Sequence, residues 1–462
     1  MSEDTQTKLF IFEYEGISIQ GNKDKIIKNN FFKYKESIRK AKKINSDKEN
    51  SKQINLILFA IILILLPQKV FLLSEHYITM KFSQVGYNQI LSDEYKGILP
   101  TKIINDDEIL FLDKNKKVFI DSINSEIILE FNNIFTDFSY MFSNLTTIAS
   151  IHIQSMFGKN CYMTYMFYNC GNLEKFTYVT NINDNLIREM KGMFYNCLSL
   201  KSFAFHDLYI GNYSVGYYYD INISYMFYNC QNLNSISFDS NYFYYIGDMK
   251  AMFYNCFSLK FIDLQSLIIR NYIDISYAFY NCKKLTSFNY YKFYAKDIRY
   301  MFYNCNSLLS VDIRNFSTSN YYLNMSNLFY NCNNLSYIYG NFSKFYISDL
   351  REMFYNCSSL ESVKIYAKSV ISRINMSKMF YQCDNIKNII FYDYDDYFYP
   401  KDLSSIFYNC TSLISLYFNY FTTYYLLDIS YMFYNCKNLN YISLERGSSF
   451  DNSLIKTFYF YF

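Results

Sequence analysis

Several residue types on which enzymes and nucleic-acid binders depend are scarce in this sequence. The 462 residues include only 3 His, 3 Pro and 12 Gly, and there is no Trp. Three scattered histidines do not make a histidine-based catalytic centre or metal cluster, and the few glycines form no phosphate-binding loop. Positive and negative charges are nearly balanced, since the chain has 44 Lys and Arg and 41 Asp and Glu, which gives a net charge of only +3. Composition therefore gives no support to nucleic-acid binding.

Apolar and aromatic residues are abundant instead. Hydrophobic residues make up 51% of the chain and aromatic residues 21%, whereas charged residues reach only 18%. This composition argues against bulk disorder and for a folded chain with a large core. The length alone suggests roughly two to four ordinary domains.

One apolar segment, residues 54–73, divides the chain. Residues Gln53 to Gln68 carry no charge, and the stretch continues to Leu73 if Lys69 snorkels, which gives the roughly 20 residues that a membrane span needs. Eight Lys and Arg lie within 33–52 but only two within 67–87, an asymmetry that predicts a cytoplasmic N-terminus. We therefore expect a single-pass type II membrane protein whose anchor is residues 54–73 and whose remaining chain is extracellular. A cleaved signal peptide and a buried core helix are the alternatives.

A five-residue phrase, Met-Phe-Tyr-Asn-Cys, recurs along the rest of the chain at a nearly constant interval. The period is about 26 residues, and periods of roughly 20–50 residues indicate stacked units that bury their apolar faces against one another. The first position of the phrase, here called position 0, falls at residues 141, 166, 193, 226, 252, 278, 301, 328, 353, 379, 406 and 432.

Each unit combines two apolar patterns of different period. Positions −3, 0, +1 and +4 are apolar, which is the i, i+3, i+4, i+7 spacing of one helical face, so we expect a short helix there. Ser or Asp often stands two to four residues before position 0, where an N-cap is needed. Positions +7, +10 and +12 are mostly apolar too, and the gap of two indicates a strand. Stacked coils would place these strands in a parallel sheet, advancing about 4.8 Å per coil.

The repeated unit resembles the BspA-type leucine-rich repeat. Residues 302–313 (Phe-Tyr-Asn-Cys-Asn-Ser-Leu-Leu-Ser-Val-Asp-Ile) carry the resemblance most clearly, and residues 311–319 match the connection of the roughly 26-residue surface-protein variant. The resemblance covers about residues 134–445. It implies an α/β fold: a leucine-rich-repeat solenoid of about 12 coils, with a parallel β-sheet on one face and short helices opposite. It also implies an exported, non-enzymatic, cell-surface interaction protein.

Two recurring residues have competing explanations. Cysteine at +4 suits a column of packed core thiols, although scattered disulfides and a metal site are alternatives. Among the 12 Cys, Cys161 lies outside the phrase and is the thiol expected to react most readily. Asparagine at +3 tolerates the left-handed backbone conformation and can hydrogen-bond along the stack; a ligand-binding column is the alternative.

The solvent side of the strand, position +11, is the predicted partner-binding face. This position varies from copy to copy, as expected of a recognition surface, although free drift of exposed positions explains the variation equally well. Exposed aromatic and aliphatic groups make Tyr339, Ile390 and Tyr417 the strongest contact candidates. The candidate residues are His152, Thr177, Ser237, Asp263, Asn289, Asp312, Tyr339, Lys364, Ile390, Tyr417 and Ser443, with Ala204 at the same position of another copy.

The remaining segments complete the predicted domain order. Strand-like runs at Tyr77–Phe82, Glu108–Leu112, Val118–Ile120 and Glu126–Phe131 suggest a β-rich cap for the open apolar end of a solenoid. Residues 1–53 resemble the opening of a ubiquitin-like β-grasp fold. The predicted order is a cytoplasmic basic segment (1–53), the transmembrane anchor (54–73), the β-rich cap (75–133), the solenoid (134–445) and a C-terminal cap or tail (446–462).

Function follows from this organisation. We expect adhesion or recognition at the cell surface, with a protein or glycan partner bound through the strand face, and no nucleic acid, cofactor or metal. The sequence contains no Ser/His/Asp set and no paired acids at a fixed repeat position, so enzymatic activity is not predicted. If residues 54–73 do not insert into a membrane, the alternative is an intracellular scaffold for protein–protein interaction.

Overall fold

The computed structural model describes residues 76–445 except for 15 short gaps. These gaps are residues 106–107, 111, 113, 155–156, 180–186, 206–219, 239–243, 270, 289–292, 315, 318–322, 341–345, 367–373, 393–398 and 420–427. The chain divides into two units, Met1–Leu72 and Leu73–Phe462, and the described residues all belong to the second. The predictions for residues 1–53, 54–73 and 446–462 therefore lie outside the described residues.

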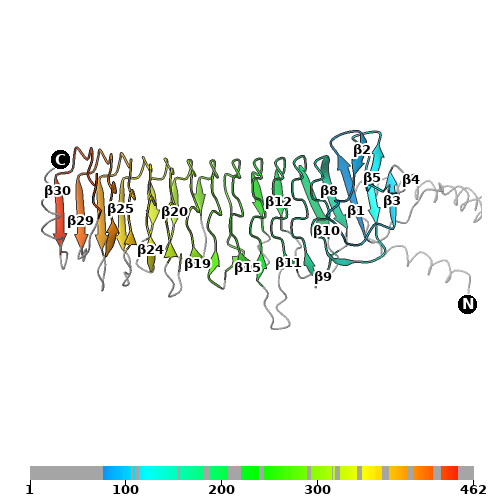
Figure 1. Cartoon of the computed structure of the whole chain (residues 1–462), viewed down its shortest axis with the longest axis horizontal. Coiled ribbons are helices and arrows are strands. Elements are labelled where there is room, and N and C mark those ends of the chain that lie inside the picture. Colours follow the sequence, from blue (N-terminus) through cyan, green and yellow to red (C-terminus); the bar gives the residue numbers. More distant parts are fainter. Residues whose placement is uncertain are drawn as a thin grey trace, which may run out of the picture. The chain divides into compact units, whose positions relative to one another are not determined.

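The second unit begins with antiparallel strands at each of the four runs predicted from the sequence (Figure 1). Strand β1 is the link to the repeats, because it pairs antiparallel with β6 on one side and with β8 on the other. β3 extends the sheet beyond β6, and β2 pairs with β5 in a separate two-stranded sheet. The strands are β1 (Tyr77–Phe82), β2 (Gly86–Gln89), β3 (Lys102–Asn105), β4 (Glu108–Leu110), β5 (Lys117–Ile120) and β6 (Ile127–Glu130).

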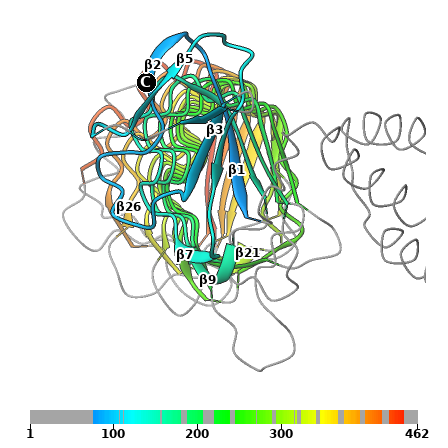
Figure 2. The same ribbon diagram turned by 90° about the vertical axis from the view of Figure 1, so that its right-hand side faces the viewer.

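The repeats then stack as a parallel β-solenoid, in which the coils contribute strands to two separate columns. Seen along the stack, successive coils superimpose (Figure 2). The first column follows the Cys position of each phrase and carries the predicted strand face. It contains β8 (Ile148–Gln154), β10 (Lys175–Val179), β12 (Ser202–Ala204), β14 (Ser235–Ser237), β18 (Ser287–Phe288), β20 (Ser310–Asp312), β23 (Tyr337–Tyr339), β25 (Ser362–Tyr366), β27 (Asn388–Tyr392), β29 (Ser415–Asn419) and β30 (Tyr441–Glu445).

The second strand column precedes each phrase, and pairing between its members is also parallel. It contains β7 (Phe135–Asp137), β9 (Phe157–Tyr162), β11 (Ile187–Glu189), β13 (Ile221–Asn222), β15 (Tyr244–Asp248), β17 (Ile273–Asp274), β19 (Phe293–Asp297), β22 (Leu323–Asn324), β24 (Ile347–Asp349), β26 (Ile374–Asn375) and β28 (Pro400–Asp402). Two short strands, β16 (Leu267–Ile268) and β21 (Phe316–Ser317), extend pairing from β15 and β19. The parallel solenoid predicted from the sequence is thus present, whereas the count of about 12 coils stays a prediction.

The predicted short helices are wrong, because the described part of the chain contains turns at every phrase and no helix. The unit at Met301 shows why. The N–H groups of Met301, Tyr303 and Cys305 each bond to the carbonyl three residues earlier, at 3.2, 3.2 and 3.1 Å. Between them, the N–H of Phe302 bonds across to the next coil, at Leu328 O, 3.0 Å away. A helix would instead bond every N–H to the carbonyl four residues earlier in its own segment.

Residues with a left-handed backbone conformation determine the shape of these turns. Positions −1 and +3 have positive φ in all twelve phrases, as in Tyr300 and Asn304, both at 57°. Two such residues per phrase interrupt a right-handed helix. The same turns keep positions −3, 0, +1 and +4 on the inside, so Ile298, Met301 and Phe302 are at most 1% exposed. The buried residues were therefore predicted correctly, although the backbone that buries them was not.

The expected N-cap residues exist in a different form. At position −4 of most phrases an Asp or Asn side chain accepts a hydrogen bond from the N–H two residues later, as from Ser276 to Asp274 at 2.9 Å and from Ser377 to Asn375 at 2.9 Å. This arrangement is an Asx-turn, which supplies the backbone with a local hydrogen bond outside a helix. It fixes the point at which each coil leaves the second strand column and enters the phrase.

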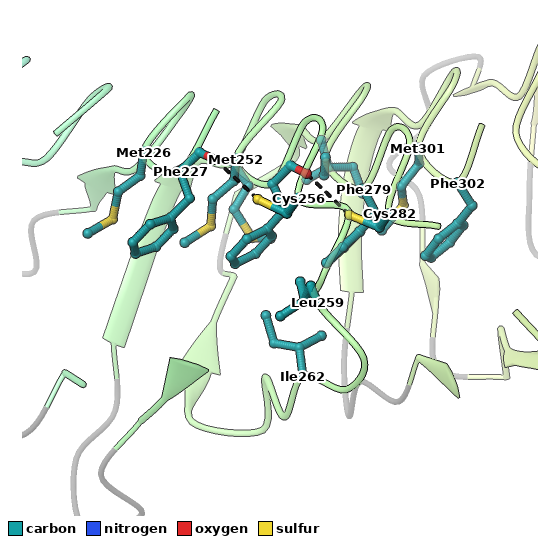
Figure 3. Close-up of a cluster of buried hydrophobic side chains, with 14 of the residues drawn as sticks. Met226, Phe227, Met252, Cys256, Leu259, Ile262, Phe279, Cys282, Met301 and Phe302 are labelled. Carbon is teal, nitrogen blue, oxygen red and sulfur yellow. Dashed lines mark hydrogen bonds between the residues drawn. The ribbon is translucent and has the colours of Figure 1, made fainter. Parts of the chain in front are cut away.

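The interior contains columns of identical side chains (Figure 3). The phenylalanine column is made of the Phe at position +1 of every phrase, and its rings stack at 5.3–5.9 Å between centroids. Methionines at position 0 lie beside it, as Met226, Met252 and Met301 show. Repetition of one large side chain at one position lets each coil pack on the next in the same way.

The cysteines form a buried thiol column. All 12 are free and buried. Each +4 thiol donates to the carbonyl of the +1 phenylalanine in the preceding coil, as Cys256 does to Phe227 O and Cys282 to Phe253 O, both at 3.2 Å. Burial raises the pKa of these thiols, including that of Cys161, which rises to about 12. Because a thiol must ionise to react, the expectation that Cys161 is the reactive thiol is not supported, and the packed-thiol interpretation is confirmed.

The asparagines at +3 form an amide column at the surface of the turns. Along the column, side-chain amides donate to the amide oxygen of a neighbouring coil, as Asn304 does to Asn281 at 2.7 Å and Asn331 to Asn304 at 2.9 Å. Asparagine satisfies two requirements at this position, since it tolerates positive φ and satisfies its own polar atoms along the stack. Gln382 occupies the position in one phrase and also has positive φ, 59°.

The predicted type II membrane topology requires correction. Among residues 76–445, in the parts that the structure describes, no helix is long and apolar enough to cross a membrane. Residues 54–73, to which the anchor was assigned, lie outside the described residues.

Candidate functional site

The first strand column brings the residues predicted at position +11 into one row. Paired strands place His152 next to Thr177 and Asp312 next to Tyr339. Ala204 is likewise in register with Ser237. The longest run comes from β25, β27, β29 and β30, where one row across the sheet consists of Lys364, Ile390, Tyr417 and Ser443. Asp263 is exposed on the same side of its coil, and Asn289 lies outside the described residues.

Alternation along each strand keeps this row on the solvent side. Ile389 and Phe391, which flank Ile390, are fully buried. Because successive strand residues point to opposite faces, the buried flanks fix Ile390 outward. The strand face is defined here as the outward positions +9 and +11 of the first strand column. Its geometry is rigid, since the buried positions that flank each outward side chain anchor it to the core.

The N-terminal part of the strand face is polar. His152 Nδ1 lies 2.9 Å from Thr177 Oγ1, and its Nε2 lies 3.4 Å from Gln154 Oε1. Both ring nitrogens are thus occupied by neighbours on the sheet. Within the described residues no group of three or more His, Cys, Asp and Glu is arranged to hold a metal ion. This part of the face offers small polar groups and little apolar contact area.

The C-terminal part of the strand face is aromatic. Tyr337 and Tyr339 of β23 are 53% and 47% exposed, and Tyr441 of β30 is 50% exposed. The ring of Tyr337 meets that of Tyr339 edge-on at 4.6 Å between centroids, and Tyr417 lies 5.5 Å from Tyr441. Position +9, which holds Tyr337 and Tyr441, was not among the predicted sites. The alternation of the strand could have revealed it, because +9 and +11 share one face.

Charge on this face is sparse. Asp312 and Arg314 pair with each other, with 2.6 Å between Oδ2 and Nη2. The hydrogen bond from Arg314 holds the pKa of Asp312 below its usual value. Lys364, also at +11, is exposed and has no ion-pair partner among the residues described. The C-terminal part of the face therefore presents aromatic and aliphatic side chains around one uncompensated positive charge.

A second aromatic surface runs along the turns. The tyrosine column consists of the tyrosines at position +2 from Tyr168 to Tyr434, whose rings stack at 4.4–5.2 Å between centroids. Because neighbouring rings cover each other's faces, a ligand can reach only their edges and hydroxyls. This surface is regular and identical from coil to coil, unlike the strand face, and it fits a role in holding the coils together.

We expect several tyrosines of the tyrosine column, Tyr195 and Tyr228 among them, to ionise at unusually high pH, because their pKa is raised. Burial, followed by the neighbouring hydroxyl of Tyr228, raises the pKa of Tyr195 to about 12. A tyrosine whose folded pKa is raised stabilises the fold fully below its unfolded value of about 10 and loses that contribution as pH rises through the folded value. The free energy of unfolding should therefore fall between about pH 10 and pH 12. Phenolate absorbance and urea unfolding, measured over this range, test the expectation.

Tyr195→Phe is the control for this titration. It keeps the stacked ring but removes the ionising hydroxyl, so one late-titrating group should disappear from the absorbance curve. If every tyrosine instead titrates as one group near pH 10 in the folded protein, the column does not shield its hydroxyls.

Family models match most of the repeat region. The family described as "Mycoplasma protein of unknown function, DUF285" matches residues 116–235, 161–293 and 273–397. A BspA type leucine rich repeat region matches residues 351–461. No curated protein matches the chain. The predicted resemblance to BspA-type repeats is thereby confirmed.

Solved leucine-rich-repeat structures resemble the chain at low identity. A leucine rich cell surface protein from Faecalibacterium prausnitzii is 17% identical, with 67% of this chain and 93% of that chain covered and a TM-score of 0.25. An internalin from Listeria monocytogenes is 17% identical, covers 66% of this chain and 83% of its own, and has a TM-score of 0.24. Toll in its complex with Spatzle, from Drosophila, is 14% identical, with 64% and 39% covered and a TM-score of 0.30. At such TM-scores the likeness says nothing about function.

The parallel coils, the recurring phrase and the family matches all describe one kind of molecule. The fold is a leucine-rich-repeat solenoid, a type common among protein-binding surface proteins. On the extent of the match, which runs from residue 116 to residue 397, the chain belongs to the family described as "Mycoplasma protein of unknown function, DUF285".

Proposed function

We propose that the protein is a non-enzymatic recognition protein of the cell surface that binds a protein partner through the C-terminal part of its strand face. The observation that carries this proposal is the row Lys364, Ile390, Tyr417 and Ser443, held in register on four adjacent strands. Aromatic groups on a rigid, partly exposed surface supply contact area at little entropic cost.

The composition of this face favours a partner with apolar and acidic groups. Tyr337, Tyr339 and Tyr441 are each about half exposed, so they lose accessible apolar area when covered. Lys364 offers one positive charge without a partner among the described residues, and a carboxylate on the ligand would satisfy it. Adhesion to another cell is one use of such a face, and recognition of a soluble protein is another.

We also propose that the solenoid has about 12 coils. The phenylalanine column supports this number, because it contains twelve rings in continuous contact.

An intracellular scaffold is the second candidate function, since the 12 free thiols are those expected in a reducing compartment. Labelling of intact cells with an antibody to the repeats separates the two candidates. Surface labelling supports the first, and labelling only after permeabilisation supports the second.

Removal of the strand-face side chains should abolish binding. We expect the variant with Tyr339, Lys364, Ile390 and Tyr417 all changed to Ser to lose binding by more than about 100-fold, because several central contact groups are removed together. The probe is a set of peptides selected from a random display library on the wild-type protein, with affinities measured by biolayer interferometry. A glycan array run in parallel tests the carbohydrate alternative.

The matched control changes three tyrosines of the tyrosine column instead. Tyr303, Tyr330 and Tyr355 become Phe, which removes hydroxyls but keeps the stacked rings. Binding should survive this change. If the selected peptides lose affinity for the tyrosine-column variant and keep it for the strand-face variant, the partner binds on the turn side and the proposed site is wrong.

A further inference from the structure

The last strand of the first strand column, β30, has a partly uncovered core side. Its inward positions +10 and +12 hold Ile442 and Leu444, which are 39% and 48% exposed. The same positions of β29 hold Leu416 and Phe418, which are only 0% and 2% exposed. β30 pairs with β29 on one edge, and no strand of the described chain pairs with its other edge (Figure 1). That second edge is therefore one half of a coil-to-coil contact.

Backbone groups also face this edge. In the middle of the stack the N–H at position +12 donates to the next coil, as from Ile313 to Tyr339 O at 2.9 Å. Residues two apart in a strand direct their backbone groups to the same edge. Ile442 and Leu444 thus direct two N–H and two C=O groups away from β29. A strand that pairs here provides partners for these groups and covers both apolar side chains.

We propose that a second copy of the chain occupies this edge, with β30 antiparallel to β30 about a two-fold axis at Ser443. Ile442 then lies opposite Leu444 of the partner subunit, and Leu444 lies opposite the partner's Ile442. Each of these pairs exchanges two backbone hydrogen bonds, because the groups of both residues face the edge. The contact therefore contains four such bonds, and it uses the same surface on both copies.

The sequence of β30, Tyr-Ile-Ser-Leu-Glu, favours a copy of itself as the partner. Ser443 has one apolar residue on each side, so rotation about it sets apolar against apolar on the core side of the sheet. A shift of two residues either puts Leu444 opposite Asn440 or carries Ile442 past the end of the strand. A shift of one residue sets core-side positions against outer-side positions. One register alone thus satisfies the side chains and the backbone together.

The other end of the same sheet column is closed by an antiparallel strand of the chain itself. β1 pairs antiparallel with β8, so an antiparallel neighbour fits the twist of this column. The sheet then ends at β4, which has only three residues, and short edge strands are poor templates for pairing with another chain. β30 has five residues with one charge, Glu445, and no proline. It lacks the features that prevent pairing at an edge.

The pairing joins the C-terminal parts of two strand faces into one continuous surface. Tyr417 and Tyr441 of each copy then lie near its centre. The pairing itself uses the backbone and the core-side residues of β30, so it holds whether or not the strand face binds the partner proposed above. A ligand with two binding segments would gain avidity from the doubled face.

Sedimentation equilibrium of the full-length protein tests the second copy. We expect a reversible monomer–dimer equilibrium with a micromolar dissociation constant, because one edge strand is a small interface. Leu444→Lys should weaken association by about 100-fold, since the symmetric contact loses the apolar group twice and gains two charges beside apolar groups. Leu309→Lys is the matched control, because Leu309 is 52% exposed in the middle of the stack. It should leave the dissociation constant within about twofold of wild type.

Cysteine cross-linking tests the register. Two Ser443→Cys side chains would meet on the axis as a pair without hydrogen bonds, with Cα atoms about 4.5 Å apart, which suits a disulfide. Oxidation with diamide should therefore give a covalent dimer, whereas the 12 native thiols are buried. Glu445→Cys is the control, because the two copies of this residue lie about 13 Å apart along the strands in the proposed register and should not cross-link.

Three results overturn the proposal. A protein that remains monomeric up to about 200 µM has no dimer of the expected affinity. A dimer that Leu444→Lys leaves intact uses another surface. Cross-linking of Glu445→Cys as efficient as that of Ser443→Cys would place the two-fold axis away from Ser443.

Discussion

Phe302→Ala should lower the free energy of unfolding of the surrounding coils by about 3–5 kcal/mol, the range for deleting a buried aromatic ring. The ring is fully buried and stacks on Phe279 at 5.6 Å and on Phe329 at 5.7 Å. Alanine would leave a void between two rings that the rigid coils on either side cannot close. The mid-point of urea unfolding measures the loss.

The loss should spread only to neighbouring coils. Each coil contacts mainly the coils before and after it, so a solenoid behaves as a nearly one-dimensional chain of interfaces. Hydrogen exchange should therefore rise near residues 279–329 first and leave the antiparallel strands β1 and β6 protected. Phe261→Ala is the matched control, since this ring is 54% exposed and should cost about 0.5 kcal/mol or less. Equal costs at the two positions would contradict the assigned core.

Asn304→Ala should also be costly, by about 2–4 kcal/mol, because a strained backbone and lost hydrogen bonds add together. The residue has a φ of 57°, a left-handed conformation that asparagine tolerates but that costs residues such as alanine about 1–2 kcal/mol. Its side chain also donates to Asn281 at 2.7 Å and accepts from Asn331 at 2.9 Å; loss of these bonds leaves the partner amides unsatisfied, which costs about 1–2 kcal/mol more. Urea unfolding again gives the magnitude.

Asn304→Gly separates the two causes. Glycine adopts positive φ without strain but lacks the amide, so it should lose only the hydrogen-bond contribution and unfold at higher urea concentration than the alanine variant. If glycine and alanine are equally destabilising, backbone conformation is not what selects asparagine at this position. If glycine is as stable as wild type, the amide column contributes nothing to stability.

The strands and the buried positions could be read from the sequence because both depend on local alternation of apolar residues. Position +10 and position +12 bracket an outward residue, and Val311 and Ile313 are indeed 1% and 2% exposed. The four runs before the repeats contain strands for the same reason. Of the candidate binding residues, those on the first strand column lie in one row, because an in-register repeat puts equal positions side by side.

The short helices were mispredicted because the spacing i, i+3, i+4, i+7 does not specify a backbone. A helix satisfies that spacing with bonds inside one segment. The turns of this protein satisfy it with alternate N–H groups directed to the next coil, as from Asn304 to Tyr330 at 2.8 Å. Only the presence of the neighbouring coil makes those outward N–H groups favourable, so the choice depends on contacts that lie a full repeat away in the sequence.

The sequence by itself determined the repeat, the identity of the core columns and the face on which variable residues stand, because each of these follows from which side chains recur at a fixed spacing. The tertiary structure decided the rest. The phrases form turns and not helices, because stacked coils offer backbone acceptors that an isolated segment lacks. Tyr337 and Tyr441 belong to the strand face because the neighbouring coils leave them exposed. The tertiary structure also buried the thiols between the coils, and this burial raises their pKa.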